Sequence, residues 1–501
     1  NQKIQQFDLR YYYSGGLNAE RMLLEEVKQE GFQPYKFYYH GITLPNRNSF
    51  ATDHWGYYTN PGNNPTTYGI PALTYQGRFY SGISKDADFS GTRAQSLHKI
   101  QFPSGAATEY VYEFNTYTDP ATNTTKTGAG LRIKEIVTST SRWNGEEISR
   151  KRYVYEEGKI SQNFPPRYAK KISFKEEVIA ATRRASFLHR SSQPFNMASL
   201  TLDNAVLYQK VRKLNEGEGD NGQTVYEFIG FQERPDVAAP KYRIDEDRPT
   251  EITQSNWSAT APYLPDSPRH WERGLLKKMS VYDRDDRLRS TTTYTYDFDR
   301  TKDKKVYGID LYYDAVNSED NRGRIAFLSY LYYGKYEEES RWVALTRTAE
   351  RTYDLAGNNY VETITDYEYK DNTELKRIKN YDGKGNTYET TYRYVDDYMA
   401  VVDGSAMIRA LDLMRKRFMF GVPIEKRTTI QKGSNAPARL LESTLHLYQL
   451  NTNSSFKDYI KYPYNEDGEF GIENTAVLKE VLHFKSKKPA ADVPSVSISG
   501  G

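Results

Sequence analysis

A phrase that begins with Tyr-Asp and ends with Tyr-x-Tyr occurs three times in this chain and constrains its fold more than any other feature. The copies span residues 282–296, 353–369 and 381–394. They begin at Tyr282-Asp283, Tyr353-Asp354 and Tyr381-Asp382, and the last two continue into Gly357-Asn358 and Gly385-Asn386. Alternate residues of a strand face one side of a sheet, and Gly-Asn tolerates the positive φ of a tight turn. Each copy therefore predicts a β-hairpin.

The spacing within the phrase varies from copy to copy. The step from Tyr-Asp to Tyr-x-Tyr is 12, 14 and 11 residues. A solenoid coil has a fixed period, whereas hairpins tolerate loops of different length. We therefore expect hairpins laid side by side in a sheet that grows with each repeat.

The composition agrees with such a sheet. The chain has 44 Tyr, against 21 Phe and 5 Trp, and tyrosine favours half-buried strand positions. Hydrophobic residues make up 37% of the chain, below the ~45–50% of typical globular domains, a range that also counts glycine. A disordered chain would lack the aromatic residues, so a broad sheet with one solvated face is the better interpretation.

Charge and residue content limit the function classes. The net charge is +3, with 69 basic and 66 acidic residues, so neither nucleic acid nor an anionic membrane is expected as a partner. The absence of cysteine excludes disulfides and thiolate metal sites. No apolar run reaches 18 residues, so no membrane span is expected. The chain begins without Met or a signal peptide, which suggests a mature product or a piece of a longer protein.

Alternating apolar and polar residues predict further strands. We expect a strand at 35–39 and hairpins at 97–113, 130–155 and 206–228. The second of these hairpins turns at Asn144-Gly145, a strong hairpin signal.

Other segments are less regular. Residues 17–30 have helical propensity, but Arg21, Leu23 and Val27 also fit a strand, and residues 176–188 fit either a strand or a helix. We expect a surface loop at 61–95, a mobile acidic loop at 215–222 and irregular structure at 232–273.

One helix is predicted late in the chain, at 405–420. Its apolar residues recur at helical spacing, and a glycine follows where a C-terminal cap belongs. The apolar positions are Met407, Ile408, Leu411, Met414 and Phe418, and the capping glycine is Gly421. The helix would cover one face of the sheet or dock a partner helix, and the first alternative is favoured. Strands at 440–448 and 475–484 and a polar tail from 485 follow.

These elements suggest five parts. They are an N-terminal β region at 1–120, hairpins with a Pro-rich segment at 121–273, repeat hairpins at 274–400, a helix with closing strands at 401–485, and a flexible tail at 486–501.

The Tyr-Asp phrases resemble YD repeats, the building unit of the rearrangement hotspot (RHS) family. Other phrases are similar to those of large RHS-like YD-repeat surface proteins of Bacteroidota, and they occur in the same order. They are Asp53-His54-Trp55-Gly56-Tyr57-Tyr58, residues 97–113, residues 130–133 and residues 414–425. Together the matches touch most of residues 20–425.

The resemblance implies an all-β fold in which antiparallel hairpins form one large curved or spiralling sheet, a shell, in an exported or cell-surface protein. Many RHS proteins enclose a C-terminal toxin, but this chain lacks the family's Asp-Pro-x-Gly-Arg signature and no toxin domain follows. The expected role is therefore a shell or surface module, not an enzyme. It would enclose or dock another polypeptide, such as a cargo, a C-terminal toxin, or an outer-membrane or secretion component.

The Asp53-His54-Trp55-Gly56-Tyr57 phrase is the first candidate site. Asp53 and His54 resemble an acid/base pair, but adjacent strand residues point to opposite faces, so Asp53 would not orient His54. We favour a structural corner over an acid/base pair. In this interpretation Asp53, His54, Trp55 and Tyr57 form a short segment that makes contacts and has no catalytic role. No Gly-x-Ser-x-Gly or His-Glu-x-x-His phrase occurs, and no catalytic residue is assigned.

Metal and sugar sites are the remaining candidates. Asp283, Asp285 and Asp286, or the acidic residues of 465–469, offer oxygen ligands for Ca²⁺, but a complete ligand loop is missing and solvated turns are favoured. No metal or cofactor is therefore expected. Exposed tyrosines either stack on sugar rings or form cross-strand ladders, and the ladders are favoured over glycan binding. A glycan-active enzyme would need two facing carboxylates, which no sequence feature places.

Overall fold

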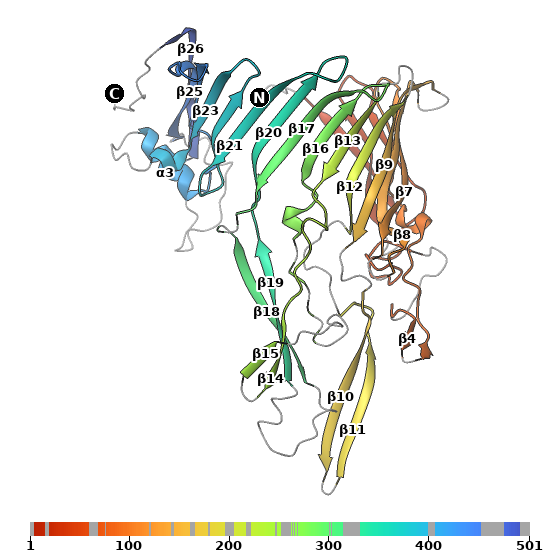
Figure 1. Cartoon of the computed structure of the whole chain (residues 1–501). Coiled ribbons are helices and arrows are strands. Elements are labelled where there is room, and N and C mark those ends of the chain that lie inside the picture. The colour runs from red at the N-terminus through yellow and green to blue at the C-terminus, as the bar shows by residue number, and fades with distance from the viewer. Residues whose placement is uncertain are drawn as a thin grey trace. The chain divides into compact units, whose positions relative to one another are not determined.

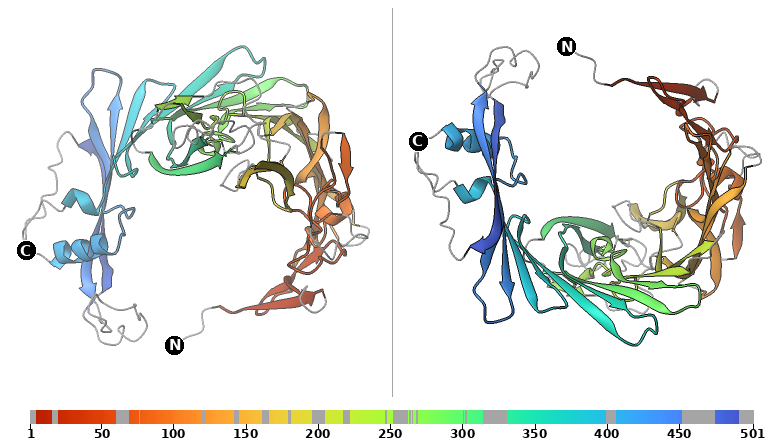
Figure 2. Two further views of the ribbon diagram at one scale, coloured as in Figure 1. Left: turned by 90° about the horizontal axis from the view of Figure 1, so that it is seen from below. Right: turned by 90° about the horizontal axis from the view of Figure 1, so that it is seen from above.

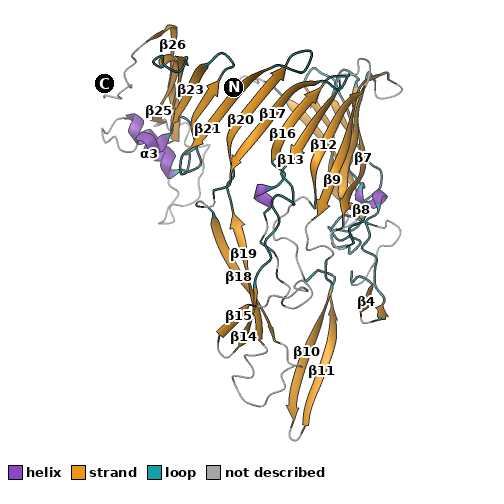
Figure 3. Cartoon of the chain, in the orientation of Figure 1, coloured by secondary structure: helices purple, strands orange, loops and turns teal. Residues whose placement is uncertain are grey.

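The computed structural model describes residues 5–490 with internal exceptions. The exceptions are residues 16–19, 60–68, 76, 120–121, 142–144, 161–165, 179–180, 196–204, 217–221, 246–247, 252–261, 263, 265, 268, 300, 302, 314–330, 399–405 and 452–474. The fold is all-β, with one large antiparallel sheet of 18 strands (Figures 1 and 3). The chain divides into two compact units, Asn1–Leu288 with Asp299–Trp342, and Arg289–Phe298 with Val343–Gly501.

The first unit contributes ten strands to the large sheet. They are β1 (Phe7–Ser14), β2 (Arg21–Gln29), β3 (Tyr35–Tyr39), β6 (Leu97–Gln101), β7 (Ala107–Thr118), β8 (Thr125–Ser139), β9 (Glu147–Ile160), β12 (Val206–Glu216), β13 (Gln223–Phe228) and β16 (Leu276–Tyr282). Each pairs antiparallel with the next in this order.

Smaller elements complete the first unit. They are the pair β4 (Leu73–Tyr75) and β5 (Arg78–Tyr80), the hairpin β10 (Ala169–Val178) and β11 (Ala181–Arg190), and a four-stranded sheet in the order β15 (Arg248–Glu251), β14 (Lys241–Asp245), β19 (Leu331–Ser340) and β18 (Lys304–Tyr313). Two short helical turns are α1 (Phe89–Thr92) and η2 (His270–Glu272).

The second unit contributes eight strands and the main helix. They are β17 (Leu288–Asp297), β20 (Ala344–Tyr353), β21 (Tyr360–Tyr369), β22 (Leu375–Tyr381), β23 (Asn386–Arg393), β24 (Glu425–Lys432), β25 (Arg439–Asn451) and β26 (Thr475–Ala490), paired antiparallel in this order, with η3 (Val395–Tyr398) and α3 (Ala406–Lys416). Helix α3 packs on β25 and β26, as the blue part of Figure 2 shows.

The core of the second unit lies under α3. Met407, Leu411 and Met414 pack against Ile424 and Leu445, and all five are buried. The helix predicted at 405–420 is thus confirmed for residues 406–416, and it covers its own sheet. Position 405 lies outside the described residues.

The predicted end of this helix is wrong. The helix stops at Lys416, and Phe418 takes the left-handed conformation (φ 56°) that was expected of Gly421. Phe418 is 82% exposed and not on the apolar face. The earlier stop lets the chain turn back so that Ile424 reaches the core.

Most predicted strands are confirmed. The hairpin predicted at 97–113 is β6–β7, that at 130–155 is β8–β9, and that at 206–228 is β12–β13. The predicted turn residue Asn144 lies outside the described residues, as do most of the acidic loop and the acidic segment 465–469. Of residues 176–188, which fitted a strand or a helix, 176–178 belong to β10 and 181–188 to β11, and 179–180 lie outside the described residues.

Four other predictions are corrected. The helical alternative for 17–30 is wrong, because β2 lies between β1 and β3 and this pairing outweighs local helix propensity. The loop predicted at 61–95 contains β4, β5 and α1, and the irregular segment at 232–273 contains β14, β15 and η2. The tail predicted from 485 is a strand as far as Ala490, because β26 continues its pairing with β25.

A cluster of ion pairs connects distant segments of the first unit around η2. Arg341 contacts Glu272, Nη1 of Arg269 lies 3.2 Å from Oε1 of Glu272, and Nη1 of Arg273 lies 2.5 Å from Oδ1 of Asp236. Arg341, Glu272, Arg273 and Asp236 are buried, Arg269 is partly buried, and the pairs join segments up to 69 residues apart. Removal of one partner from such a pair costs about 3–5 kcal/mol.

Candidate functional site

The aspartate of the Tyr381-Asp382 phrase caps the turn between β22 and β23. Oδ1 of Asp382 accepts the backbone N–H groups of Lys384 (2.9 Å) and Asn386 (2.8 Å), and Oδ2 accepts Nδ2 of Asn386 (2.8 Å). The side-chain amide of Asn386 lowers the pKa of Asp382. Gly385 has a φ of 80°, so the loop is a turn closed by a left-handed residue, a common hairpin connection.

The other two copies have similar caps, and the turn at Asp354 is one residue longer, because the N–H of Asp354 donates to the carbonyl of Asn359 (2.9 Å). Between β20 and β21, Asp354 accepts the N–H of Asn358 (3.0 Å) and Nδ2 of Asn359 (2.8 Å), which lowers its pKa. Asp283 accepts the N–H of Asp285 (2.9 Å) and the N–H of Arg287 (3.0 Å).

The left-handed position of these turns is Gly357 (φ 75°) in one copy and Asp286 (φ 57°) in the other. Asp283 and Asp285 also form ion pairs with Arg287. Asp283, Asp354 and Asp382 therefore each cap their own turn, whereas Oδ1 of Asp286 accepts Nε2 of Gln223 on β13 (2.8 Å).

The Asp53 phrase is a fourth copy of this turn. Oδ1 of Asp53 accepts the N–H groups of Trp55 and Tyr57, both at 2.9 Å. The N–H of Asp53 donates to the carbonyl of Tyr57 (2.9 Å), as that of Asp382 donates to Asn386 (3.1 Å). Gly56 has a φ of 90°. Three of these four turns share the sequence Asp-x-x-Gly, which begins at Asp53, Asp354 and Asp382, whereas the turn at Asp283 has Asp286 in place of the glycine.

The surroundings of Asp53 differ from those of the other copies. Its side chain is only 2% exposed, and its Oδ2 has no hydrogen-bond partner in the part of the chain that the structure describes. The residue that donates to Oδ2 of Asp382 is Asn386, and Tyr57 occupies that position here. Burial raises the pKa of Asp53 to about 6, although three backbone N–H groups and Lys85 oppose this.

The other residues of this phrase contact different neighbours. Nδ1 of His54 lies 3.1 Å from the hydroxyl of Tyr168, and burial lowers the pKa of His54. The rings of Trp55 and Tyr117 are 6.0 Å apart. A Cβ on Gly130 would lie 2.7 Å from the ring of Tyr57, so this glycine makes room for that ring. The phrase therefore connects its turn to neighbouring segments, and it does not place Asp53 and His54 as an acid/base pair.

Tyrosine hydroxyls form a second recurring contact that the sequence did not predict. In each case the second aromatic residue of an aromatic-x-Tyr pair donates to the backbone carbonyl of a Leu or Ile in the preceding strand. The pairs are Tyr39 to Leu24 (2.9 Å), Tyr112 to Leu97 (2.5 Å), Tyr155 to Ile133 (2.6 Å), Tyr369 to Leu345 (3.0 Å) and Tyr394 to Leu375 (2.8 Å). These hydroxyls hold neighbouring strands together.

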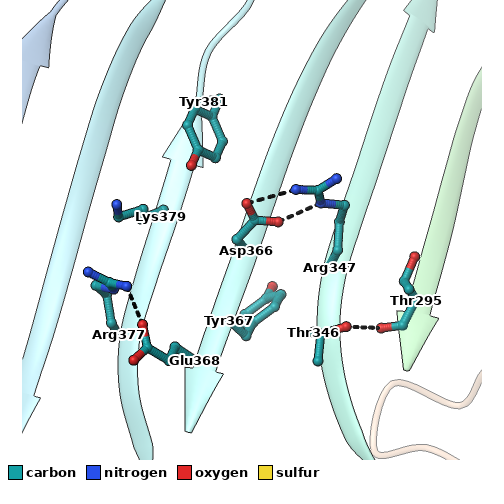
Figure 4. Close-up of a pocket in the computed structure, with 9 residues that line it drawn as sticks. All are labelled: Thr295, Thr346, Arg347, Asp366, Tyr367, Glu368, Arg377, Lys379 and Tyr381. Atoms are coloured by element: carbon teal, nitrogen blue, oxygen red, sulfur yellow. Dashed lines mark hydrogen bonds and ion pairs between the residues drawn. The ribbon is translucent and has the colours of Figure 1, made fainter. Parts of the chain in front are cut away.

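The exposed surface of the repeat sheet is charged. A groove of about 530 Å³ lies over β17, β20, β21 and β22 in the second unit (Figure 4). Its lining comprises Thr295, Thr346, Arg347, Asp366, Tyr367, Glu368, Arg377, Lys379 and Tyr381. Figure 4 shows Asp366 and Glu368 between Arg347 on one side and Arg377 and Lys379 on the other. We call this surface the charged groove.

The charges of the groove alternate in sign from strand to strand. Arg347, Asp366, Lys379 and Glu389 are register partners across β20 to β23. Nε of Arg347 lies 2.6 Å from Oδ1 of Asp366, and Nζ of Lys379 lies 3.2 Å from Oε2 of Glu389. We call such a line of register partners a charge row.

The first unit has a charge row of its own. Glu156, Lys210, Glu227 and Lys278 are register partners across β9, β12, β13 and β16. Lys210 lies 3.2 Å from Glu156, and Lys278 lies 3.8 Å from Glu227. Each unit thus pairs partly exposed cations and anions across neighbouring strands.

The residues predicted from the sequence do not converge on one site. Asp283, Asp354 and Asp382 lie in separate turns, and Asp53 lies in a fourth. Of the groove residues, Tyr367 and Tyr381 belong to the repeat phrases, but the charged residues were missed. The hairpin register contained a signal for them, because Arg347 and Asp366 are equidistant from the centre of the turn at Asp354. Among the described residues, no group of three or more His, Asp or Glu is arranged to hold a metal.

The comparisons with known proteins give no identification. No protein-family model matches this sequence, and no curated protein is significantly similar to it. None of the described helices is long and apolar enough to cross a membrane.

Proposed function

We propose that this protein is a non-enzymatic YD-repeat module of the RHS type, exported or held at the bacterial cell surface, that encloses or docks another polypeptide. The partner would be a cargo, a C-terminal toxin, or an outer-membrane or secretion component. The charged groove is the docking surface in this proposal.

The observation that supports the proposal is that the repeat residues and the sheet surface have different roles. The caps and the tyrosine hydroxyls act within the fold, whereas the groove presents Arg377, Lys379, Asp366 and Glu368 on a broad sheet surface. A surface of mixed charge suits an extended polypeptide of mixed charge, because each partner charge finds an opposite one. A catalytic site would instead need a base and its orienting group within hydrogen-bond reach of each other.

Glycan binding is the second candidate. Tyr367 and Tyr381 line the groove beside an arginine and a carboxylate. Aromatic faces and bidentate polar groups are also the groups that hold sugar rings and hydroxyls. The two candidates differ in whether charge or ring faces dominate the binding.

The test is capture of partners from the native source by the wild-type chain and by a double variant, Arg377→Glu with Lys379→Glu. The matched control is Arg284→Glu, which reverses an exposed charge in a turn of the first unit. The proposal expects one stoichiometric partner with the wild type and the control, and at least a tenfold loss with the double variant. Equal capture by all three would contradict it, and binding to a glycan array that the double variant preserves would favour the second candidate.

A further inference from the structure

Strand β1 is an edge of the large sheet and is exposed on both faces. In the described part of the chain its one strand neighbour is β2. Phe7, Leu9, Tyr11, Tyr12 and Tyr13 are all large apolar residues and are 38–67% exposed. An exposed edge strand of this kind readily pairs with another strand.

The backbone of β1 determines which residues can form that pairing. The N–H of Glu30 donates to the carbonyl of Gln6 (3.2 Å), so these two residues form a hydrogen-bonded pair. In an antiparallel ladder such pairs alternate with residues whose N–H and C=O point the other way. Asp8 and Arg10 therefore direct their backbone groups toward β2, and Phe7, Leu9 and Tyr11 direct theirs outward.

Charge then selects one register for a second copy of the same strand. Residues whose backbone groups point away from β2 must lie opposite one another to form hydrogen bonds between two copies. The twofold axis that relates two antiparallel copies can therefore pass through Asp8, Leu9 or Arg10, and we call the pairing centred on that residue. Centring on Asp8 or on Arg10 puts two like charges opposite each other. Centring on Leu9 puts Asp8 of each copy opposite Arg10 of the other, and Phe7 opposite Tyr11.

This register also extends the charge rows found within the chain. In β2, Lys28 lies opposite Asp8 and Glu26 lies opposite Arg10. Pairing centred on Leu9 would create the row Lys28, Asp8, then Arg10 and Glu26 of the second copy, which alternates in sign across four strands. The rows that contain Asp366 and Glu227 have this same alternation. On the other face, Val27 and Leu9 meet Leu9 and Val27 of the second copy.

We propose that β1 pairs antiparallel with β1 of a second copy of this chain, centred on Leu9, and forms a twofold-symmetric dimer. The proposal does not rest on the proposed function, because it concerns an edge of the first unit and not the charged groove. The short strand predicts a reversible dimer, visible as a rise in mass between about 1 and 100 µM protein.

The register is tested by cysteine trapping in the full chain, which has no cysteine of its own. Hydrogen-bonded partners in an antiparallel pair have Cα atoms about 5.5 Å apart, within the range of a disulfide. Leu9→Cys should therefore form a covalent dimer on mild oxidation. Phe7→Cys is the matched control and should not, because position 7 lies opposite position 11. Equal cross-linking of both variants, or of neither, would overturn the proposal.

The charges are tested by two variants that are each self-repulsive but mutually complementary. Arg10→Asp gives a strand with two acidic positions, and Asp8→Arg gives one with two basic positions. Each variant alone should dimerise at least about tenfold more weakly than the wild type in sedimentation experiments. An equimolar mixture should recover dimers, which also shows that both variants are folded.

A mixture that stays monomeric would overturn the proposal. So would a wild-type chain that stays monomeric at 100 µM, since the edge would then be left for a strand of another protein. Growth into ever larger species would also overturn it, because a symmetric pairing closes at two copies.

Discussion

Two copies of one turn behave differently in the two units of the molecule. Asp53 and Asp382 accept backbone N–H groups at nearly the same distances, and each precedes a glycine with positive φ by three residues. Yet the pKa of Asp53 is raised to about 6, whereas that of Asp382 is lowered. The local sequence therefore determines the turn, and the surroundings determine the charge state.

The difference arises from burial and from one residue. Asp53 is buried in the first unit, where desolvation disfavours the carboxylate. Asn386 donates to the second carboxylate oxygen of Asp382, whereas Tyr57 stands at that position beside Asp53. A turn that is a surface cap in the repeat has become a buried corner in the first unit.

The largest expected effect is on the pH dependence of stability. Because the folded-state pKa of Asp53 is raised, its contribution to stability is present below pH 4 and is lost as the pH rises through about 6. The difference from the ordinary value of 3.8 corresponds to about 3 kcal/mol. Asp53→Asn keeps the accepting oxygen and removes the charge. It should make the free energy of unfolding of the first unit higher than that of the wild type at pH 8, but not at pH 4.

Urea unfolding at both pH values measures this effect. Asp382→Asn is the control. Because the pKa of Asp382 is lowered, this variant should lose stability between pH 4 and 8 as the wild type does. If Asp53→Asn left the pH profile of the wild type unchanged, the buried-corner interpretation would be wrong.

The second-largest expected effect is the loss of stability on removal of each aspartate cap, compared at pH 5, where Asp53 is protonated. Asp53→Ala leaves the N–H groups of Trp55 and Tyr57 without their acceptor in a buried site, and we expect a loss of about 2 kcal/mol. Asp382→Ala should cost less, because water can reach its turn. Thermal unfolding of both variants checks the order, and an equal or larger loss for Asp382→Ala would break the comparison.

A smaller effect concerns the left-handed residue of the turn. Gly385→Ala puts a Cβ on a residue with a φ of 80° and should cost about 1 kcal/mol. Asp286 already occupies this conformation with a side chain, so Asp286→Gly relieves backbone strain but loses the hydrogen bond from Nε2 of Gln223 (2.8 Å). Because that hydrogen bond is exposed to solvent, Asp286→Gly should be neutral or stabilising, by at most about 1 kcal/mol. Urea unfolding of the two single variants is the measurement. A destabilising Asp286→Gly would show that its side chain matters more than its backbone.

The smallest effect is on the pKa of Asp382 itself. Asn386→Ala removes the amide that donates to Oδ2, so the pKa should rise toward its ordinary value. NMR titration of the carboxyl carbon follows this change. An unchanged pKa would indicate that the backbone N–H groups alone stabilise the carboxylate.

Much of the sheet was predictable from local patterns, because strand alternation and Asp-x-x-Gly turns are encoded within a few residues. The hairpins β6–β7 and β12–β13 and the helix α3 are examples. Local propensity failed at Arg21–Gln29, where pairing with two neighbouring strands outweighs a preference for helix. It also failed at Phe418, where the path of the chain to the core sets the helix end.

The site was less predictable for a similar reason. The repeat carboxylates were visible in the sequence, but their hydrogen bonds show that they cap turns. Arg347 and Asp366 become partners only once the hairpin register is known. The pairing of Glu272 with Arg341 spans 69 residues and leaves no local signal. The Asp-x-x-Gly spacing at Asp53 was available, and comparison with the repeat turns would have revealed it.

The most direct test of the central claim is a single NMR titration of carboxyl carbons in protein labelled at aspartate, with Asp53→Asn and Asp382→Asn to assign the two signals. The account predicts that Asp53 titrates near pH 6 and that Asp382 titrates below the ordinary value of 3.8. If both signals moved together below pH 4, the two turns would share one environment, and the distinction between buried corner and surface cap would be wrong.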